Sequence, residues 1–215
     1  MPKFVNIATY GRSGSTLLAG ILNLLPGWYI RGETMLATKG LFDFWLRSGK
    51  ALAPSCKARE SPWRTDVWPD RDLLCRTMRE MLEAYYDPTR KHEVIGSKEV
   101  SYDQVQTREE FWEFLDFQRM LTGCLFVINT RNIDKVIASA WWAEDPEGSR
   151  RIVGKVDEWL TSYAAEHREY CIVVRYEDVI RPETGEVRRL FEWLGAGDHY
   201  DEGALRKTLQ LRWGY

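Results

Sequence analysis

The sequence predicts a single α/β domain over residues 1–215, with three α/β/α layers around a central parallel sheet. Short apolar, β-branched segments alternate with amphipathic segments that have the period of a helix. The strand-like segments are apolar throughout, which is typical of a parallel sheet covered on both faces. The length fits one large α/β domain, and no linker, internal repeat or low-complexity tract divides it.

Five segments are predicted strands because they are short, apolar and bounded by polar or turn-forming residues. They span residues 3–9, 28–31, 93–98, 124–130 and 170–175. Cys124 and Cys171 open apolar runs in the last two, and none of the four cysteines has CxxC spacing. We interpret them as reduced thiols, which favours a cytoplasmic protein.

Helices are predicted where apolar residues recur every three or four positions. They cover residues 17–25, 41–46, 74–85, 111–121, 133–142, 150–169 and 187–194. Pro26-Gly27 ends the first, residues 145–148 separate the fifth from the sixth, and Gly195 is the expected C-cap of the last. Residues 50–71 contain three prolines and no clear period, so we expect an irregular excursion there.

Composition narrows the possible partners. The 30 Lys and Arg residues nearly balance 32 Asp and Glu, so the net charge is −2. This balance disfavours a nucleic-acid or acidic-membrane partner, which attracts a basic excess. The apolar stretch at residues 17–26 is interrupted and too short for a membrane span, which takes about 20 residues. The ten tryptophans indicate a need for large, flat apolar surfaces.

The loop between the first strand and the first helix is rich in glycine and serine, an arrangement that binds phosphate through backbone N–H groups and the helix N-terminus. Its residues are Gly11, Arg12, Ser13, Gly14, Ser15 and Thr16. A Walker motif starting at Gly11 would need Lys where Leu17 stands, and this absence counts against an ATPase or nucleotide kinase. The alternative is an ordinary strand-to-helix turn with Ser15 or Thr16 as N-cap.

The run from Thr9 to Leu17 resembles the 5′-phosphosulfate loop of sulfotransferases that use 3′-phosphoadenosine 5′-phosphosulfate (PAPS). Carbohydrate and tyrosylprotein members of that family commonly have Arg where Arg12 stands. A second family element is an Arg after a strand and a Ser eight residues later, matched here by Arg131 and Ser139. A third is a strand ending in Tyr-Glu-Asp, matched from Tyr176 onward, followed by a helix ending in Leu-Gly.

The resemblance implies a P-loop-like sulfotransferase fold, PAPS as the sulfate donor, 3′-phosphoadenosine 5′-phosphate (PAP) as the product and no metal. The implied nucleotide-binding residues are Gly11, Arg12, Ser13, Gly14, Ser15, Thr16, Arg131, Ser139 and Tyr176. Arg131 and Ser139 would bind the 3′-phosphate, and Tyr176 would contact the adenine side. Alternatively, Arg131 is a surface residue, Ser139 is a small residue at a helix crossing and Tyr176 belongs to a solvated turn.

Three residues are candidates for the chemistry. Arg12 would stabilise the leaving group, and Lys98, at the end of a predicted strand, corresponds to a family lysine near the sulfuryl group. Val100 stands where cytosolic members have a catalytic His, but tyrosylprotein members use a Glu 21 residues after the loop Arg, which is Glu33 here. We therefore predict Glu33 as general base. Glu33 could instead pair with Arg31 or another cation, and Glu99 is the alternative base.

The acceptor is expected between residues 32–72 and 141–155, which lie between the nucleotide-binding elements and lack regular patterning. The resemblance implies a small-molecule or carbohydrate acceptor with a hydroxyl group. Several tryptophans fall in these segments and indicate an aromatic or sugar ring on it, unless they only pack the irregular segments; they are Trp45, Trp63, Trp68, Trp141 and Trp142. Trp112, Trp159 and Trp193 are predicted core residues. A P-loop-type kinase and a non-catalytic nucleotide-binding module are the competing interpretations.

Overall fold

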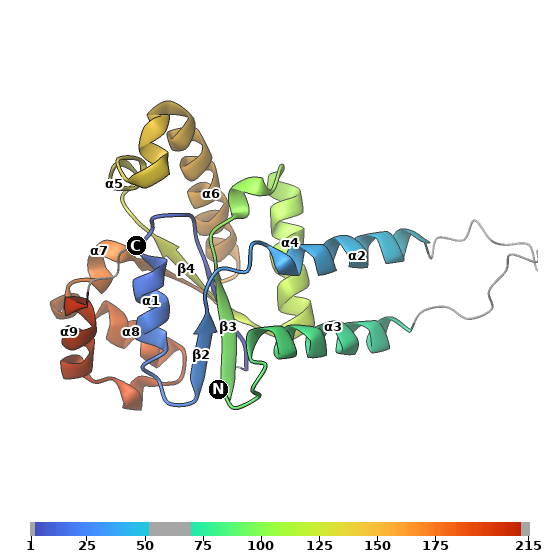
Figure 1. Cartoon of the computed structure of the whole chain (residues 1–215), viewed down its shortest axis with the longest axis horizontal. Helices are drawn as coiled ribbons and strands as arrows, with labels where there is room; N and C mark the ends of the chain where they lie inside the picture. Colours follow the sequence, from blue (N-terminus) through green and yellow to red (C-terminus); the bar gives the residue numbers. More distant parts are fainter. Residues whose placement is uncertain (1–2, 52–69, 212–215) are drawn as a thin grey trace, which may run out of the picture.

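The computed structural model describes residues 3–51 and 70–211, and it contains one parallel five-stranded sheet with the order β2-β3-β1-β4-β5 (Figure 1). The strands are β1 (Val5–Ala8), β2 (Trp28–Arg31), β3 (Val94–Glu99), β4 (Leu125–Thr130) and β5 (Cys171–Arg175). Each lies within two residues of its predicted bounds. The predicted α/β class with a central parallel sheet is confirmed.

Helices cover both faces of the sheet (Figure 1). They are α1 (Ser15–Leu22), α2 (Ala37–Ala51), α3 (Arg71–Tyr86), α4 (Arg108–Thr122), α5 (Ile133–Ile137), α6 (Pro146–Glu166), α7 (Tyr176–Val179), α8 (Glu186–Trp193) and α9 (Glu202–Gln210). One apolar core packs side chains of α3, α4 and α6 against the sheet, and the other packs those of α1, α8 and α9. The sheet is therefore buried from both sides, which explains why its strands are apolar throughout.

The strand β1 occupies the centre of the sheet and pairs with β3 on one side and β4 on the other. All four of its residues are buried. At Gly96 in β3 the backbone of β1 comes so close that an added Cβ would lie 1.7 Å from the Val5 carbonyl oxygen. The central position of β1 puts the loop that follows it at the carboxyl edge of the sheet, where open α/β sheets bind ligands.

The predicted helix at residues 133–142 is wrong in its second half. The helix α5 ends at Ile137, Ser139 is extended, Ala140 has φ +51° and a 3₁₀ turn, η3 (Ala140–Glu144), follows. A left-handed Ala cannot continue an α-helix. The predicted break at residues 145–148 is also too wide, because Asp145 caps α6 and Pro146 is its first residue. Proline is tolerated there since the first N–H of a helix has no intrahelical partner.

Helical structure extends beyond the prediction in three places. The helix α9 and the short α7 were not predicted, and α9 buries only Leu205 and Thr208, too few residues for a clear apolar period. Within the segments 32–72 and 141–155, α2 is longer than the predicted helix at 41–46, α6 starts four residues before the predicted 150, and η3 was not predicted. Cys56, Trp63 and Trp68 lie outside the described residues.

The predicted core tryptophans Trp112, Trp159 and Trp193 are partly buried and pack against the two apolar cores. Cys75, Cys124 and Cys171 are free thiols, and burial raises the pKa of Cys124 to about 11. No helix in residues 3–51 or 70–211 combines the length and apolarity needed to cross a membrane.

Candidate active site

The loop between β1 and α1 is held by side chains from the neighbouring strand β4 and from η3. Asn129 Nδ2 donates to the Ser13 carbonyl at 3.1 Å, Arg131 Nη1 to the Arg12 carbonyl at 2.8 Å and Trp142 Nε1 to the Gly11 carbonyl at 3.1 Å. Three consecutive carbonyls are thus bound by the protein. Because a trans peptide directs its N–H opposite to its C=O, the next three N–H groups point away from these donors. They remain available to an anion.

The N-terminus of α1 continues this anion-binding surface. Gly14 is the N-cap residue, with φ +87°, and neither a side-chain cap nor an acidic residue is present in the first turn. Ser15 and Thr16 are the first helical residues, so the alternative in which one of them caps the helix is wrong. Uncapped N–H groups and the helix dipole together favour a bound anion such as phosphate or sulfate.

Arg131 follows β4 directly and is fixed from two sides. Its backbone N–H donates to the Tyr10 hydroxyl at 2.9 Å, and that hydroxyl donates to Asp157 Oδ1, also at 2.9 Å. Burial, together with the Asp157 carboxylate, raises the pKa of Tyr10, so its hydroxyl remains protonated. The Arg131 guanidinium lies over the Tyr176 ring, 4.5 Å from its centroid. Arg131 is therefore a fixed cation at the carboxyl edge and not a free surface residue.

Tyr176, the first residue of α7, packs directly on the loop. A Cβ added to Gly14 would lie 2.1 Å from Tyr176 Cδ2, so only glycine allows this approach. The structure thus brings Arg131, Tyr176 and the loop together. Ser139 is half-buried and its hydroxyl donates to the Val136 carbonyl at 2.9 Å. Among the described residues, no hydrogen bond joins Ser139 to Arg131 or to the loop.

Lys98 and Glu33 form an ion pair beside the start of α1. Lys98 is 5 % exposed, and its Nζ lies 2.6 Å from Glu33 Oε1 and 3.3 Å from Thr16 Oγ1. The pairing of Glu33 with a cation is thus observed, but Arg31 is not the partner, because its guanidinium lies over the Tyr85 ring. Lys98 is buried and not a solvated strand-end residue. The pair places a carboxylate and an ammonium within reach of the phosphate loop.

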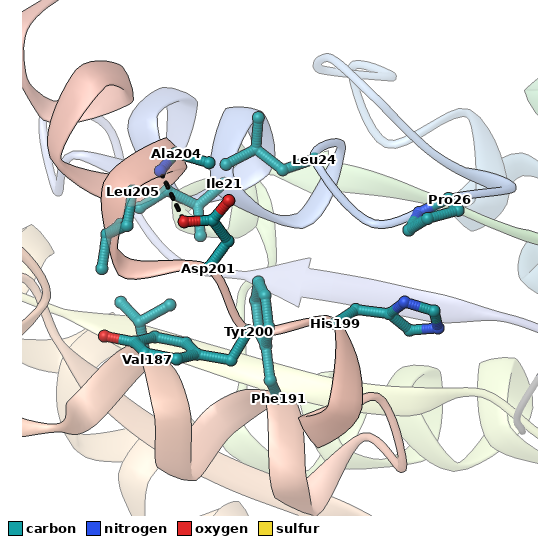
Figure 2. A pocket seen from close by; sticks show the side chains of 10 residues that line it. All are labelled: Ile21, Leu24, Pro26, Val187, Phe191, His199, Tyr200, Asp201, Ala204 and Leu205. Carbon is teal, nitrogen blue, oxygen red and sulfur yellow. Dashed lines mark hydrogen bonds between the residues drawn. The ribbon is translucent and has the colours of Figure 1, made fainter.

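A hollow of 320 Å³ lies next to this ion pair, lined by Thr16, Ala19, Gly20, Asn23, Ile30, Gly32, Glu33 and Lys98. Figure 2 shows a second hollow, of 220 Å³, between α1, α8 and α9. Its walls are mainly apolar, and the Asp201 carboxylate at its rim accepts from Ala204 N at the start of α9. No predicted site residue lines this second hollow.

The residues at the loop suit a ligand that carries several negative charges. Arg12 is exposed, and it adds a cation to those of Lys98 and Arg131. Within the described part of the chain, the buried Ser13 Oγ and Arg131 Nε have no hydrogen-bond partner. Unpaired buried donors are costly, and an anionic ligand offers them acceptors. No group of three or more potential metal ligands occurs among residues 3–51 and 70–211.

Comparison with known proteins decides the family. The model of the sulfotransferase family matches residues 5–200, which include every predicted site residue. The chain belongs to the sulfotransferase family. Sulfuryl transfer is therefore its reaction class, and the predicted family membership is confirmed.

Among solved structures, the sulfotransferase STF9 from Mycobacterium avium aligns with 13 % sequence identity and a TM-score of 0.44. The alignment covers 100 % of this sulfotransferase and 69 % of that chain. No curated protein sequence matches.

Several residues that shape the site of this sulfotransferase were missed by the sequence analysis. Asn129 holds the Ser13 carbonyl, and Tyr10 and Asp157 hold Arg131. Trp142 was predicted on the acceptor side, but its bond to the Gly11 carbonyl was not predicted. Asn129 could have been found from the sequence, because it is a polar residue that follows four apolar residues in a predicted strand. Tyr10 and Asp157 could not, since their contact joins residues 147 positions apart.

Proposed function

We propose that this sulfotransferase transfers the sulfuryl group of PAPS to a hydroxyl of a small-molecule or carbohydrate acceptor and releases PAP, with Glu33 as general base. The observation that carries the proposal is the ion pair of Glu33 with Lys98, 2.6 Å long, beside Thr16 at the phosphate loop. We further propose that residues 1–215 form one catalytic domain that works in the cytoplasm.

The donor nucleotide would bind along the carboxyl edge of the sheet. The backbone from Gly11 to Gly14 and the first helical residues, Ser15 and Thr16, would hold the 5′-phosphosulfate. Arg131, whose fixed guanidinium suits bidentate recognition, would bind the 3′-phosphate together with Ser139. Tyr176, which packs between Gly14 and Arg131, would contact the adenine side.

The transfer is an in-line displacement at sulfur. The acceptor oxygen forms a bond to sulfur, its proton moves to the Glu33 carboxylate, and the bond from sulfur to the 5′-phosphate oxygen breaks. The electron pair of that bond stays on the PAP phosphate, where Arg12 and Lys98 offset the developing charge. The chain supplies position, charge and one base, and the step consumes no other reactant.

The acceptor would lie between Glu33 and the exposed indole of Trp141. This side chain is 55 % exposed, lies near the Arg12 guanidinium and reaches Gly11 of the loop. Trp45 and Trp142 instead pack against an apolar core. An exposed indole at the loop favours an acceptor with an aromatic or sugar ring.

Ligand-dependent thermal stability tests the proposal. We expect PAP to raise the melting temperature, since a ligand at 100 times its Kd stabilises the folded state by about 2.7 kcal/mol. ATP with magnesium should stabilise less. Turnover is then measured by intact-mass screening of hydroxyl acceptors with PAPS. Magnesium-dependent phosphoryl transfer from ATP would instead establish a kinase, and selective PAP binding without turnover would establish a binding module.

The Arg131→Ala variant tests recognition of the 3′-phosphate. We expect binding of PAPS to weaken roughly 10- to 100-fold, because a charge-assisted bond to an ion contributes about 1.5–3 kcal/mol. Binding of adenosine 5′-phosphosulfate, which lacks the 3′-phosphate, should change much less. Titration calorimetry with both nucleotides gives the comparison, with Arg12→Ala expected to weaken both. Equal losses for Arg131→Ala would contradict this role.

A further inference from the structure

We infer that Glu99 is a positioning residue that holds Glu33 against Lys98; the inference rests on the proposed function of Glu33. Glu99 ends β3, next to Lys98, and is 4 % exposed. Its carboxylate joins the end of β3 to the segment that carries Glu33.

Each of the two oxygens of the Glu99 carboxylate accepts two hydrogen bonds. Oε2 accepts from Thr34 Oγ1 at 2.7 Å and from Leu36 N at 2.8 Å; Thr34 is the first and Leu36 the third residue after Glu33. Oε1 accepts from Val100 N at 2.8 Å and from Ser101 N at 2.9 Å. With four donors and little exposure, this carboxylate has no free position from which to take a proton from an acceptor. The contacts of Glu99 therefore suit a residue that positions the chain and not a general base.

The segment held by Glu99 has an unfavourable backbone. Met35 and Leu36 have φ values of +50° and +55°, in the left-handed region that side chains other than glycine rarely adopt. Such a conformation persists only where its surroundings enforce it. The bond from Leu36 N to Glu99 supplies that enforcement. It thereby fixes the direction in which the chain leaves Glu33.

The other side of Glu99 is tied to the phosphate loop. Thr9 N donates to the Glu99 carbonyl at 3.1 Å, and Ala8 of β1 lies opposite Glu99 in the sheet register. Lys98, one residue earlier, reaches Thr16 and Glu33. Glu99 therefore connects the segment after Glu33 to β3, which carries Lys98, and to Thr9 at the start of the phosphate loop.

The Glu99→Gln variant tests this role. An amide that keeps its oxygen toward Val100 and Ser101 turns its NH₂ toward Leu36 N, which cannot accept a hydrogen bond. We expect kcat to fall at least tenfold with PAP affinity unchanged, and the Leu36 amide to exchange its hydrogen at least tenfold faster. Thr34→Val, which removes one of the four donors and keeps the carboxylate, should give a smaller change in the same direction.

Asp87→Asn is the matched control. Asp87 is 3 % exposed and its carboxylate also accepts four bonds, two from Thr89 and two from His92, before the start of β3. This variant should lower the melting temperature without changing kcat or the exchange of Leu36.

A double-mutant cycle separates positioning from an independent effect. In the Glu33→Gln background, Glu99→Gln should cause no further loss of kcat, because the positioned group is already disabled. An undiminished further loss, unchanged exchange at Leu36, or an effect no larger than that of Asp87→Asn would each overturn the inference. Full activity of Glu33→Gln would remove Glu33 from the mechanism, and the exchange of Leu36 would still report whether Glu99 holds the segment.

Discussion

The Glu33→Gln variant should lose roughly 100- to 10,000-fold in kcat, the range that a positioned general base contributes. Glutamine has nearly the same shape and its side-chain oxygen still accepts a bond from Lys98 Nζ, but it cannot take the acceptor proton. PAP binding should therefore be preserved. Single-turnover sulfation, followed by intact mass, measures the chemical step, and a thermal shift with PAP measures binding.

The control is Glu83→Gln. Glu83 pairs with Lys3 at 2.6 Å, the length of the Glu33–Lys98 pair, but lies on α3 away from the phosphate loop. The Glu83→Gln variant removes an ion pair of the same length without touching the proposed chemistry, so kcat should stay at the wild-type value. Wild-type kcat in Glu33→Gln, or an equal loss in both variants, would show that Glu33 is not the base.

The Gly14→Ala variant should lose about 100-fold or more in PAP affinity. At φ +87° an alanine costs about 1–2 kcal/mol relative to glycine. Its Cβ would also lie 2.1 Å from Tyr176 Cδ2, so the ring has to move. Moving Tyr176 removes the surface over which the Arg131 guanidinium lies, so the effect extends from the 5′ side of the site to the 3′ side.

The Gly123→Ala variant is the control that measures only the cost of placing an alanine at a positive φ. Gly123 is the C-cap residue of α4, with φ +68°, and an added Cβ meets no atom within 4 Å. This variant should lose a similar stability, about 1–2 kcal/mol, and keep its PAP affinity. Chemical denaturation measures the stability and calorimetry the affinity. If both glycine variants bind PAP equally well, the contact between Gly14 and Tyr176 is not needed for the nucleotide.

The sheet was predictable because strands buried on both faces are continuous apolar segments, as in β4. Glu33, Lys98 and Arg131 were found by resemblance to a family, which supplies positions but no contacts. The ion pair between Glu33 and Lys98 spans 65 residues, and it depends on β2 and β3 being neighbours, an order that no local pattern contains.

Two features that the sequence does not reveal share a physical cause. The break after α5 depends on one left-handed residue, Ala140, whose side chain has no preference for that conformation. The role of Glu99 depends on four donors from two segments that meet only in the folded chain. Patterns of hydrophobicity detect which face of an element is buried, but they do not report a single unusual φ value or a convergence of donors.

The central position of β1 also determines when the protein can acquire its structure during synthesis. The strand leaves the ribosome before its partners β3 and β4, which begin at Val94 and Leu125. Tyr176, which covers Gly14, follows later still. At about 5–20 residues per second, roughly 10–30 s of translation separate the phosphate loop from its last contact. Until β3 and β4 have emerged, the apolar face of α1 has no complete sheet to pack on, so a nascent chain of this sulfotransferase should depend on chaperones over that part of its synthesis.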